Sequence, residues 1–142
     1  MTSIDIEYAY KLLENEEMPG WLCMVKDGGT TIYERWEGTT SQKGVASLGH
    51  YSKGACLERM VRVMAGIDIL PNNKIVIAPK VGGHISFIKC CYQSVYGIIE
   101  SSWKKTNDKV KYHLEIPSNV ICSFGVANQS YELKAGTYDF FI

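Results

Sequence analysis

The stretch that decides the fold is Val110–Ile116, which reads V-K-Y-H-L-E-I and alternates apolar and polar residues without a break. A side-chain period of two is that of a β-strand with one face in a core and the other in water. The four apolar residues therefore share a buried face. The polar residues, His113 among them, are expected to be solvated.

Further segments of strand character lie on both sides of this one, and turn residues such as Thr106-Asn107-Asp108 separate them. Six or seven short strands with regular turns indicate an antiparallel β-sandwich. The predicted neighbours of Val110–Ile116 are Lys74–Ala78, Ile85–Tyr92, Tyr96–Lys105, Val120–Val126, Tyr131–Lys134 and Thr137–Ile142.

Apolar residues change to helical spacing before Pro71. Ile4–Glu17 is predicted to be a helix that ends at Pro19-Gly20. Tyr51–Ile67 has the strongest helical pattern, with an apolar stripe along one side. The sequence therefore predicts an α+β protein with a helical segment at 1–70 and an antiparallel β-sandwich at 71–142. The helical stripe is formed by Leu57, Met60, Val61 and Met64.

Two stretches between the predicted helices have weaker patterns. Trp21–Val25 is apolar but too short to assign, and Gly38–Gly49 is rich in Gly, Ser and Thr and is predicted to be a loop.

The composition excludes several classes of protein. Of the 142 residues 46% are hydrophobic and 21% charged, as in globular domains and unlike disordered chains. A formal net charge of zero gives no electrostatic case for nucleic acid or an anionic membrane surface as partner. No apolar run approaches the ~18 residues of a membrane helix.

Cysteine usage and the N-terminus favour a cytoplasmic protein. The five cysteines show no Cys-x-x-Cys spacing and are expected to be reduced and mostly buried, with Cys90 and Cys91 on opposite faces of a strand. The N-terminus has neither the basic start nor the apolar run of a signal peptide. No zinc spacing occurs, and Gly82-Gly83-His84 lacks the spacing of a phosphate loop. We therefore expect no metal and no cofactor.

The densest group of polar and aromatic side chains lies in Thr30–Gly38, which reads T-T-I-Y-E-R-W-E-G. Aromatic faces stack on sugar rings, Arg and carboxylate groups bind hydroxyls, and a carboxylate can activate water. The alternative is that the two aromatic residues, Tyr33 and Trp36, belong to the core. The charged residues would then lie on the surface; they are Glu34, Arg35 and Glu37. His50, directly before the second helix, is likewise either a site residue or a structural histidine.

These residues resemble a known family. Thr30–Gly38, with the preceding Pro19-Gly20-Trp21 and Gly28-Gly29, is similar to the late-barrel motif of bacterial α-L-rhamnosidases of glycoside hydrolase family 78, approximately G-A-T-T-I-W-E-R-W-D-G. His50–Ala55 resembles the N-H-Y-x-Y-G-A segment that follows, and Arg62–Ile67 resembles its R-x-x-A-G-I continuation.

The resemblance continues into the β-rich half. Ile75–Pro79 resembles the I-x-I-x-P entry into the family's C-terminal domain, and Tyr96-Gly97 with Ser101-Ser102-Trp103 resembles its Y-G … S-x-W strand. These segments follow one another in the family's order through almost the whole chain. The resemblance implies that residues before Pro71 are the last part of an (α/α)6 catalytic barrel, followed by the β-sandwich.

The resemblance also implies a chemistry. The family hydrolyses terminal α-L-rhamnosides with inversion, using a general acid and a general base. Glu34 stands where the family has the general base, while Tyr33, Arg35, Trp36 and His50 would bind the sugar. The general acid belongs to a barrel segment upstream of Met1, so the chain alone is expected to be inactive.

Two further expectations follow from the missing barrel. The partner would be a rhamnose-containing glycan or glycoside when the barrel is complete, and the exposed helical stripe would favour self-association. A non-catalytic β-sandwich module that binds carbohydrate or protein is the alternative function.

Overall fold

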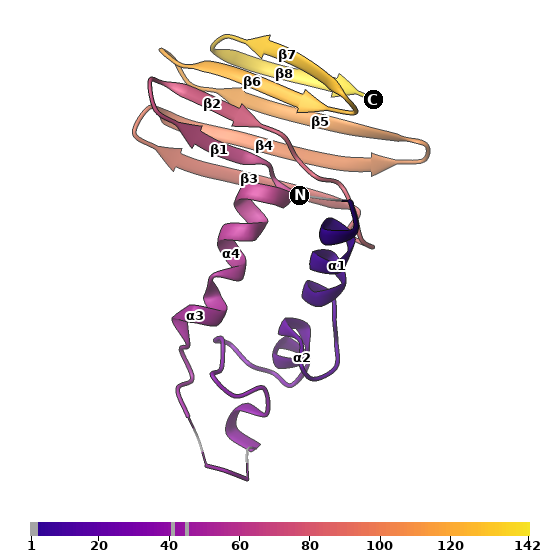
Figure 1. The fold of residues 1–142 in the computed structure, drawn as a ribbon, viewed down its shortest axis with the longest axis vertical. Helices are drawn as coiled ribbons and strands as arrows, with labels where there is room; N and C mark the ends of the chain where they lie inside the picture. Colours follow the sequence, from indigo (N-terminus) through magenta and orange to yellow (C-terminus); the bar gives the residue numbers. More distant parts are fainter. Residues whose placement is uncertain (1–2, 41, 45) are drawn as a thin grey trace. The chain divides into compact units, whose positions relative to one another are not determined.

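The computed structural model describes residues 3–40, 42–44 and 46–142, which fold as two compact units (Figure 1). The first unit is the chain up to Leu57 together with Gly82–His84, and the second is Glu58–Val81 together with Ile85–Ile142. Helices dominate the first unit and two β-sheets the second. The α+β class with a β-sandwich is therefore confirmed.

The first unit is built from short helices. Helix α1 (Ser3–Leu13) confirms the first predicted helix, although it ends four residues before Glu17. An exposed turn follows, in which the Asn15 side-chain amide donates to the carbonyl of Pro19 at 2.9 Å. The unassigned apolar run is a helix, α2 (Trp21–Lys26), and the predicted loop contains only the 3-10 turn η1 (Gly38–Thr40) among its described residues.

The pair Gly82-Gly83 packs against α1. A Cβ atom at Gly82 would lie 2.9 Å from the ring of Tyr10, and one at Gly83, where φ is +56°, would lie 2.5 Å from a Glu14 carboxylate oxygen. The amide of His84 donates to the same Glu14 oxygen at 2.8 Å. Glycine is needed here because no side chain fits beside the buried Tyr10 ring.

The second predicted helix is interrupted and shorter than expected. It comprises α3 (Tyr51–Gly54), α4 (Cys56–Arg59) and the π-helical turn η2 (Met60–Met64). The extension to Ile67 was wrong, because Gly66 adopts φ +76° and ends the helix. A Cβ atom at Gly66 would lie 2.2 Å from the backbone nitrogen of Pro79, so only glycine fits.

Ile67 instead begins a strand that the sequence patterns did not predict. Two four-stranded sheets are present, in the orders β1-β2-β6-β7 and β3-β4-β5-β8. All neighbouring strands are antiparallel except β2 and β6, which are parallel. The strands are β1 (Ile67–Leu70), β2 (Lys74–Ile77), β3 (Phe87–Ser94), β4 (Gly97–Thr106), β5 (Lys109–Ile116), β6 (Ile121–Val126), β7 (Gln129–Leu133) and β8 (Gly136–Phe141).

Asparagines supply the left-handed backbone at several strand connections. Ala127 and Asn128, the two residues between β6 and β7, have φ of +49° and +64°. Positive φ at both central residues is required by the tight hairpin turn whose twist matches that of the strands. Asn72 and Asn73 have the same handedness between β1 and β2.

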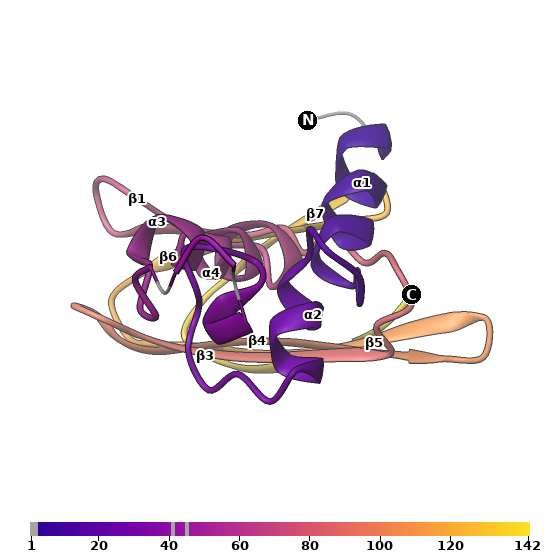
Figure 2. The same cartoon turned by 90° about the horizontal axis from the view of Figure 1, so that it is seen from below.

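The core lies between the two sheets, which Figure 2 shows as superposed layers. The decisive alternation in β5 behaves as predicted, since Tyr112, Leu114 and Ile116 are buried and Val110 packs half-buried against the same core. Tyr112 meets Phe124 of the opposite sheet with ring centroids 5.6 Å apart, and Phe124 packs on Phe140 at 4.8 Å. The alternation in each strand thus turns apolar side chains of both sheets toward the shared core.

The core also caps the end of η2. The indole nitrogen of Trp103, a residue 1% exposed, donates to the carbonyl of Met64 at 2.9 Å. The hydroxyl of Ser101 donates to the carbonyl of Ala65 at 2.6 Å, and both side chains point inward from β4. A helix leaves its last carbonyls without intrahelical partners. The Ser-x-Trp pair supplies two of the missing donors.

All five cysteines are free, but they differ in burial. Cys23 and Cys122 are buried, whereas Cys91 is exposed on the outer face of its sheet and Cys90 faces inward. Cys56, like Cys90, is half-buried, so the expectation that the cysteines are mostly buried was wrong.

Candidate functional site

Glu34 is held by a two-bond connection across the Thr30–Gly49 region. Its backbone amide donates to the carbonyl of Ser47 at 2.8 Å, and its Oε2 accepts from the amide of Ser47 at 3.1 Å. The Glu34 side chain is exposed. One carboxylate oxygen is thus held by a charge-assisted hydrogen bond from the backbone of a neighbouring loop.

Arg35 holds the same loop through hydrogen bonds to its backbone. Its guanidinium donates to the carbonyls of Lys43 and Gly44, both at 2.7 Å. Its carbonyl accepts from the amide of Gly38 at 3.0 Å. Arg35 thereby ties together the segments on either side of η1.

Tyr33 is half-buried between glycines. A Cβ atom at Gly38 would lie 2.4 Å from the Tyr33 ring, and one at Gly29 would lie 2.8 Å from its hydroxyl oxygen. The two glycines let the backbone approach the ring, and Gly38 has φ +55°. Tyr33 therefore acts as a packing centre for this loop.

Trp36 lies at the centre of an aromatic and cationic group. Trp21 of α2 meets it edge to face, with ring centroids 5.6 Å apart and an interplanar angle of 86°. The ammonium of Lys53 lies 3.5 Å from the centroid of the Trp36 ring, and the indole nitrogen of Trp21 donates to the Lys53 carbonyl at 3.1 Å. Both aromatic residues are therefore locked against α3.

His50 caps α3. Its Nδ1 accepts from the amide of Lys53 at 3.4 Å, and its own amide donates to the carbonyl of Ile32 at 2.7 Å. Since Nδ1 accepts, a neutral His50 carries its proton on Nε2 and can donate from there. The imidazole stacks on the ring of Tyr51, with centroids 6.0 Å apart.

These contacts link several of the sequence-predicted residues. His50 and Trp36 both contact Lys53. Burial lowers the pKa of Lys53, and the charges of Cys23, Glu34 and Glu37 act in the opposite direction without cancelling this effect. Arg35 and Tyr33 shape the loop that carries Glu34. Sequence reasoning missed Lys53, Trp21 and Ser47. For Lys53 the signal was its place inside the H-Y-S-K-G segment.

The described part of the chain offers no group of three or more His, Cys, Asp or Glu residues that could hold a metal ion. Over the same residues, none of the helices is long and apolar enough to cross a membrane.

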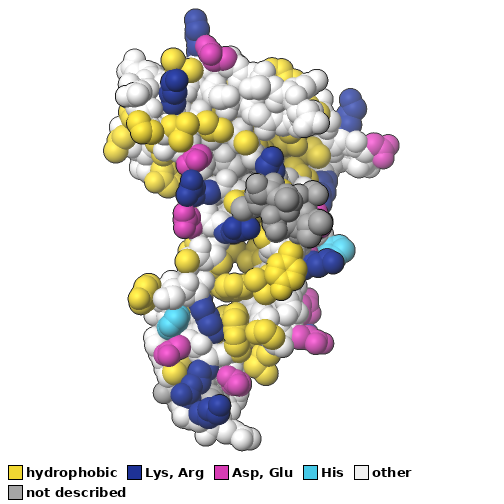
Figure 3. Space-filling view, viewed as in Figure 1, with side chains coloured by type: hydrophobic (Ala, Val, Ile, Leu, Met, Phe, Trp, Pro, Cys, Tyr) yellow, Lys and Arg dark blue, Asp and Glu magenta, His cyan; other side chains and the backbone are white. Residues whose placement is uncertain are grey.

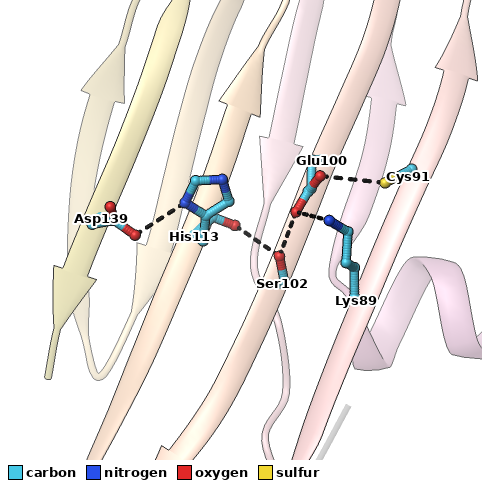
Figure 4. A network of polar contacts seen from close by, with 6 residues as sticks. All are labelled: Lys89, Cys91, Glu100, Ser102, His113 and Asp139. Carbon is cyan, nitrogen blue, oxygen red and sulfur yellow. Dashed lines mark hydrogen bonds and ion pairs between the residues drawn. The ribbon is translucent and has the colours of Figure 1, made fainter.

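A second polar cluster lies on the outer face of the sheet β3-β4-β5-β8 (Figure 4). Glu100 accepts from Ser102 at 2.9 Å and from the thiol of Cys91 at 3.3 Å, and pairs with Lys89 at 3.2 Å. Burial alone would raise the pKa of Glu100, but these donors together hold it below its usual value.

The neighbouring pair of this cluster joins two strands. His113, expected to be solvated, is half-buried, with its Nδ1 3.0 Å from Asp139. This contact and that with Lys111 lower the pKa of Asp139. The polar groups of the cluster form hydrogen bonds and ion pairs with one another across neighbouring strands. These contacts connect the strands of the sheet.

Large apolar side chains are exposed on the helical unit. On the face shown in Figure 3 they gather over α1 and α2. Tyr51 is 89% exposed and Leu57 59%. The other exposed apolar residues of this unit include Tyr8, Leu12, Leu22, Val25 and Leu48.

Known families match both parts of the chain. Residues 3–64 match the bacterial alpha-L-rhamnosidase 6 hairpin glycosidase domain, and residues 73–139 match the bacterial alpha-L-rhamnosidase C-terminal domain. An alpha-L-rhamnosidase of Formosa agariphila is 31% identical over 96% of this chain, and one of Streptomyces avermitilis is 27% identical over 80%. The chain spans only 16% and 12% of their lengths.

Solved structures show the same fold. The alpha-L-rhamnosidase of Streptomyces avermitilis complexed with L-rhamnose superposes with a TM-score of 0.83 at 21% identity, over 96% of this chain and 16% of that one. The enzyme from Dictyoglumus thermophilum gives a TM-score of 0.81 at 24% identity, over 95% of this chain and 18% of that one.

Proposed function

Because the chain belongs to the bacterial α-L-rhamnosidase family, matching the end of its 6-hairpin domain and its C-terminal domain, we propose that it is the base-side portion of a rhamnoside hydrolase. Its reaction is inverting hydrolysis of terminal α-L-rhamnosides. The division into a helical segment at residues 1–70, which carries the site, and a β-sandwich at 71–142 follows the same proposal.

Glu34 is the general base. Inverting glycosidases place two carboxyl groups ~6.5–9.5 Å apart, and one of them takes a proton from the attacking water. The observation that carries the assignment is the contact of Glu34 with Ser47. The amide of Ser47 holds Oε2, so that the carboxylate has a fixed orientation.

The sugar-binding residues divide into two kinds. Trp36 and His50 offer an aromatic face and an imidazole N–H to the ring and its hydroxyls. Arg35 and Tyr33 act by holding the loop, as their contacts with Gly44 and Gly38 indicate. The ligand class is a rhamnose-containing glycan or glycoside.

The general acid lies in the barrel segment that precedes the matched region in the relatives. A base without an acid leaves the glycosidic oxygen unprotonated, so the leaving group departs poorly. The isolated chain is therefore inactive. Its exposed apolar side chains, such as Tyr51 and Leu57, are those that the preceding barrel segment would cover.

The test uses a joined protein, in which this chain replaces the matched C-terminal portion of the Formosa agariphila relative. The relative itself is the positive control. We expect the joined protein to hydrolyse an aryl α-L-rhamnoside and Glu34→Gln to reduce kcat by a factor of ~10²–10⁴. Glu37→Gln is the matched control, because it removes a carboxylate three residues away.

Azide distinguishes a base from a merely structural carboxylate. As an anionic nucleophile it needs no proton removed, so it should restore turnover to Glu34→Gln as the glycosyl azide. Normal turnover by Glu34→Gln without azide would remove Glu34 from the mechanism.

A further inference from the structure

The ammonium group of Lys53 has no hydrogen-bond partner among the described residues, although it lies at the centre of the candidate site. Its Nζ has less than 1 Å² of exposed surface and no hydrogen-bond partner, and it is the one buried side-chain nitrogen or oxygen for which this is true within residues 3–40, 42–44 and 46–142. It lies 3.5 Å from the centroid of the Trp36 ring. An aromatic face attracts a cation but accepts none of the three hydrogen bonds that an ammonium can donate.

The backbone of Lys53 is fixed on both sides. Its amide donates to His50 and its carbonyl accepts from the indole of Trp21. Burial lowers the pKa of Lys53, and the nearby charges of Cys23, Glu34 and Glu37 offset this lowering only in part. Buried polar groups are ordinarily hydrogen-bonded, so an exception of this kind indicates a missing acceptor.

The charges nearby restrict what the acceptor can be. The carboxylates of Glu34 and Glu37 act on the ammonium without bonding to it. They would repel an anionic ligand. A hydroxyl group, in contrast, can accept from an ammonium and donate to a carboxylate at the same time.

We propose that Lys53 is a sugar-binding and specificity-determining residue, whose ammonium donates a hydrogen bond to one hydroxyl of the rhamnosyl ring bound beside Trp36. The assignment rests on the proposed function for its ligand. The flexible four-carbon stem lets the ammonium leave the ring face and reach that hydroxyl. Arg35 is less suited to this role, because its guanidinium already donates to two loop carbonyls.

Equilibrium binding of L-rhamnose to the joined protein tests the assignment, because the sugar is expected as a partner only when the barrel is complete. Titration calorimetry measures affinity, and the fluorescence of the isolated chain, in which Trp36 is one of three tryptophans, responds when the ammonium leaves the Trp36 ring. Lys53→Met should weaken binding about tenfold to hundredfold, as expected for one lost hydrogen bond to a charged group, and should change the fluorescence before sugar is added. Lys53→Arg should recover part of the affinity.

Lys11→Met is the matched control, because it removes the same charge from an exposed position of the same unit. Equal affinity of the unaltered joined protein and its Lys53→Met variant for L-rhamnose would overturn the role of Lys53 while leaving the proposed function intact. Absence of L-rhamnose binding to the unaltered joined protein would also overturn it. The turnover of the joined protein would then decide separately on the proposed function.

A second measurement avoids substitution of Lys53, in case Lys53→Met does not fold. Monodeoxy analogues of L-rhamnose are titrated into the unaltered joined protein carrying ¹³C-labelled lysine, and the Lys53 Cε resonance is followed. L-Rhamnose should shift this resonance, and one of the analogues should fail to shift it and bind about tenfold or more weakly. An unmoved resonance with L-rhamnose at saturation would contradict the proposal.

Discussion

Replacing Trp103 with Phe should destabilise the β-sandwich strongly, because Trp103 both fills the core and caps η2. The substitution leaves the buried carbonyl of Met64 without its donor, which costs about 1–3 kcal/mol. It also removes three heavy atoms from a side chain that is 1% exposed, worth about 1–2 kcal/mol more. The expected loss is about 2–5 kcal/mol of unfolding free energy.

Urea unfolding followed by far-ultraviolet circular dichroism measures this loss. Tyr138→Phe is the matched control, since it deletes a donor that bonds the carbonyl of Lys134 at an exposed position and should cost less than about 1 kcal/mol. Ser101→Ala should cost about 1–3 kcal/mol by uncovering the carbonyl of Ala65. A Trp103→Phe loss no larger than that of Tyr138→Phe would refute the capping argument.

Three other predictions concern local features. Gly66→Ala should lower the unfolding free energy by about 3 kcal/mol or more, because the new Cβ would lie 2.2 Å from the backbone nitrogen of Pro79. Gly28→Ala is the control for urea unfolding: Gly28 has a similar φ but open space around it, so the change should cost only about 1 kcal/mol. Burial raises the pKa of Tyr10 to about 12. The neutral phenol therefore contributes its full share of the unfolding free energy below pH 10, and about 2–3 kcal/mol of that free energy is lost between pH 10 and 12. Tyr10→Phe should lack this alkaline loss when unfolding is measured as a function of pH. The exposed side chains of Tyr51 and Leu57 should promote association, so sedimentation velocity should show dimers or larger species. Leu57→Glu should reduce the fraction of these species, and a clean monomer of the unaltered chain would contradict the prediction.

Periodicity was sufficient to predict the sandwich but not its first strand. The alternation of β5 places apolar side chains on one face whatever surrounds it, so its burial pattern could be predicted. Strand β1 has only four residues and follows a helix directly, and its apolar residues also fit a helical stripe. What ends the helix is the left-handed backbone of Gly66 beside Pro79, a tertiary contact.

The residue types of the candidate site could be predicted from the sequence, but the contacts that each residue makes could not. The cluster of Glu34 and Trp36 was visible in the sequence as a dense polar and aromatic run. That Arg35 bonds loop carbonyls while Lys53 covers Trp36 depends on how α3 packs against α2. Such pairings join residues far apart in sequence, and no local pattern encodes them.

The most direct test of the account is the rate of aryl α-L-rhamnoside hydrolysis by this chain alone and by the joined protein, at equal molar concentration. The account predicts no turnover above the uncatalysed rate for the chain alone, and turnover that depends on Glu34 once the barrel segment precedes it. Hydrolysis by the isolated chain at a rate comparable to that of the joined protein would contradict the claim that it carries only the base side of the site.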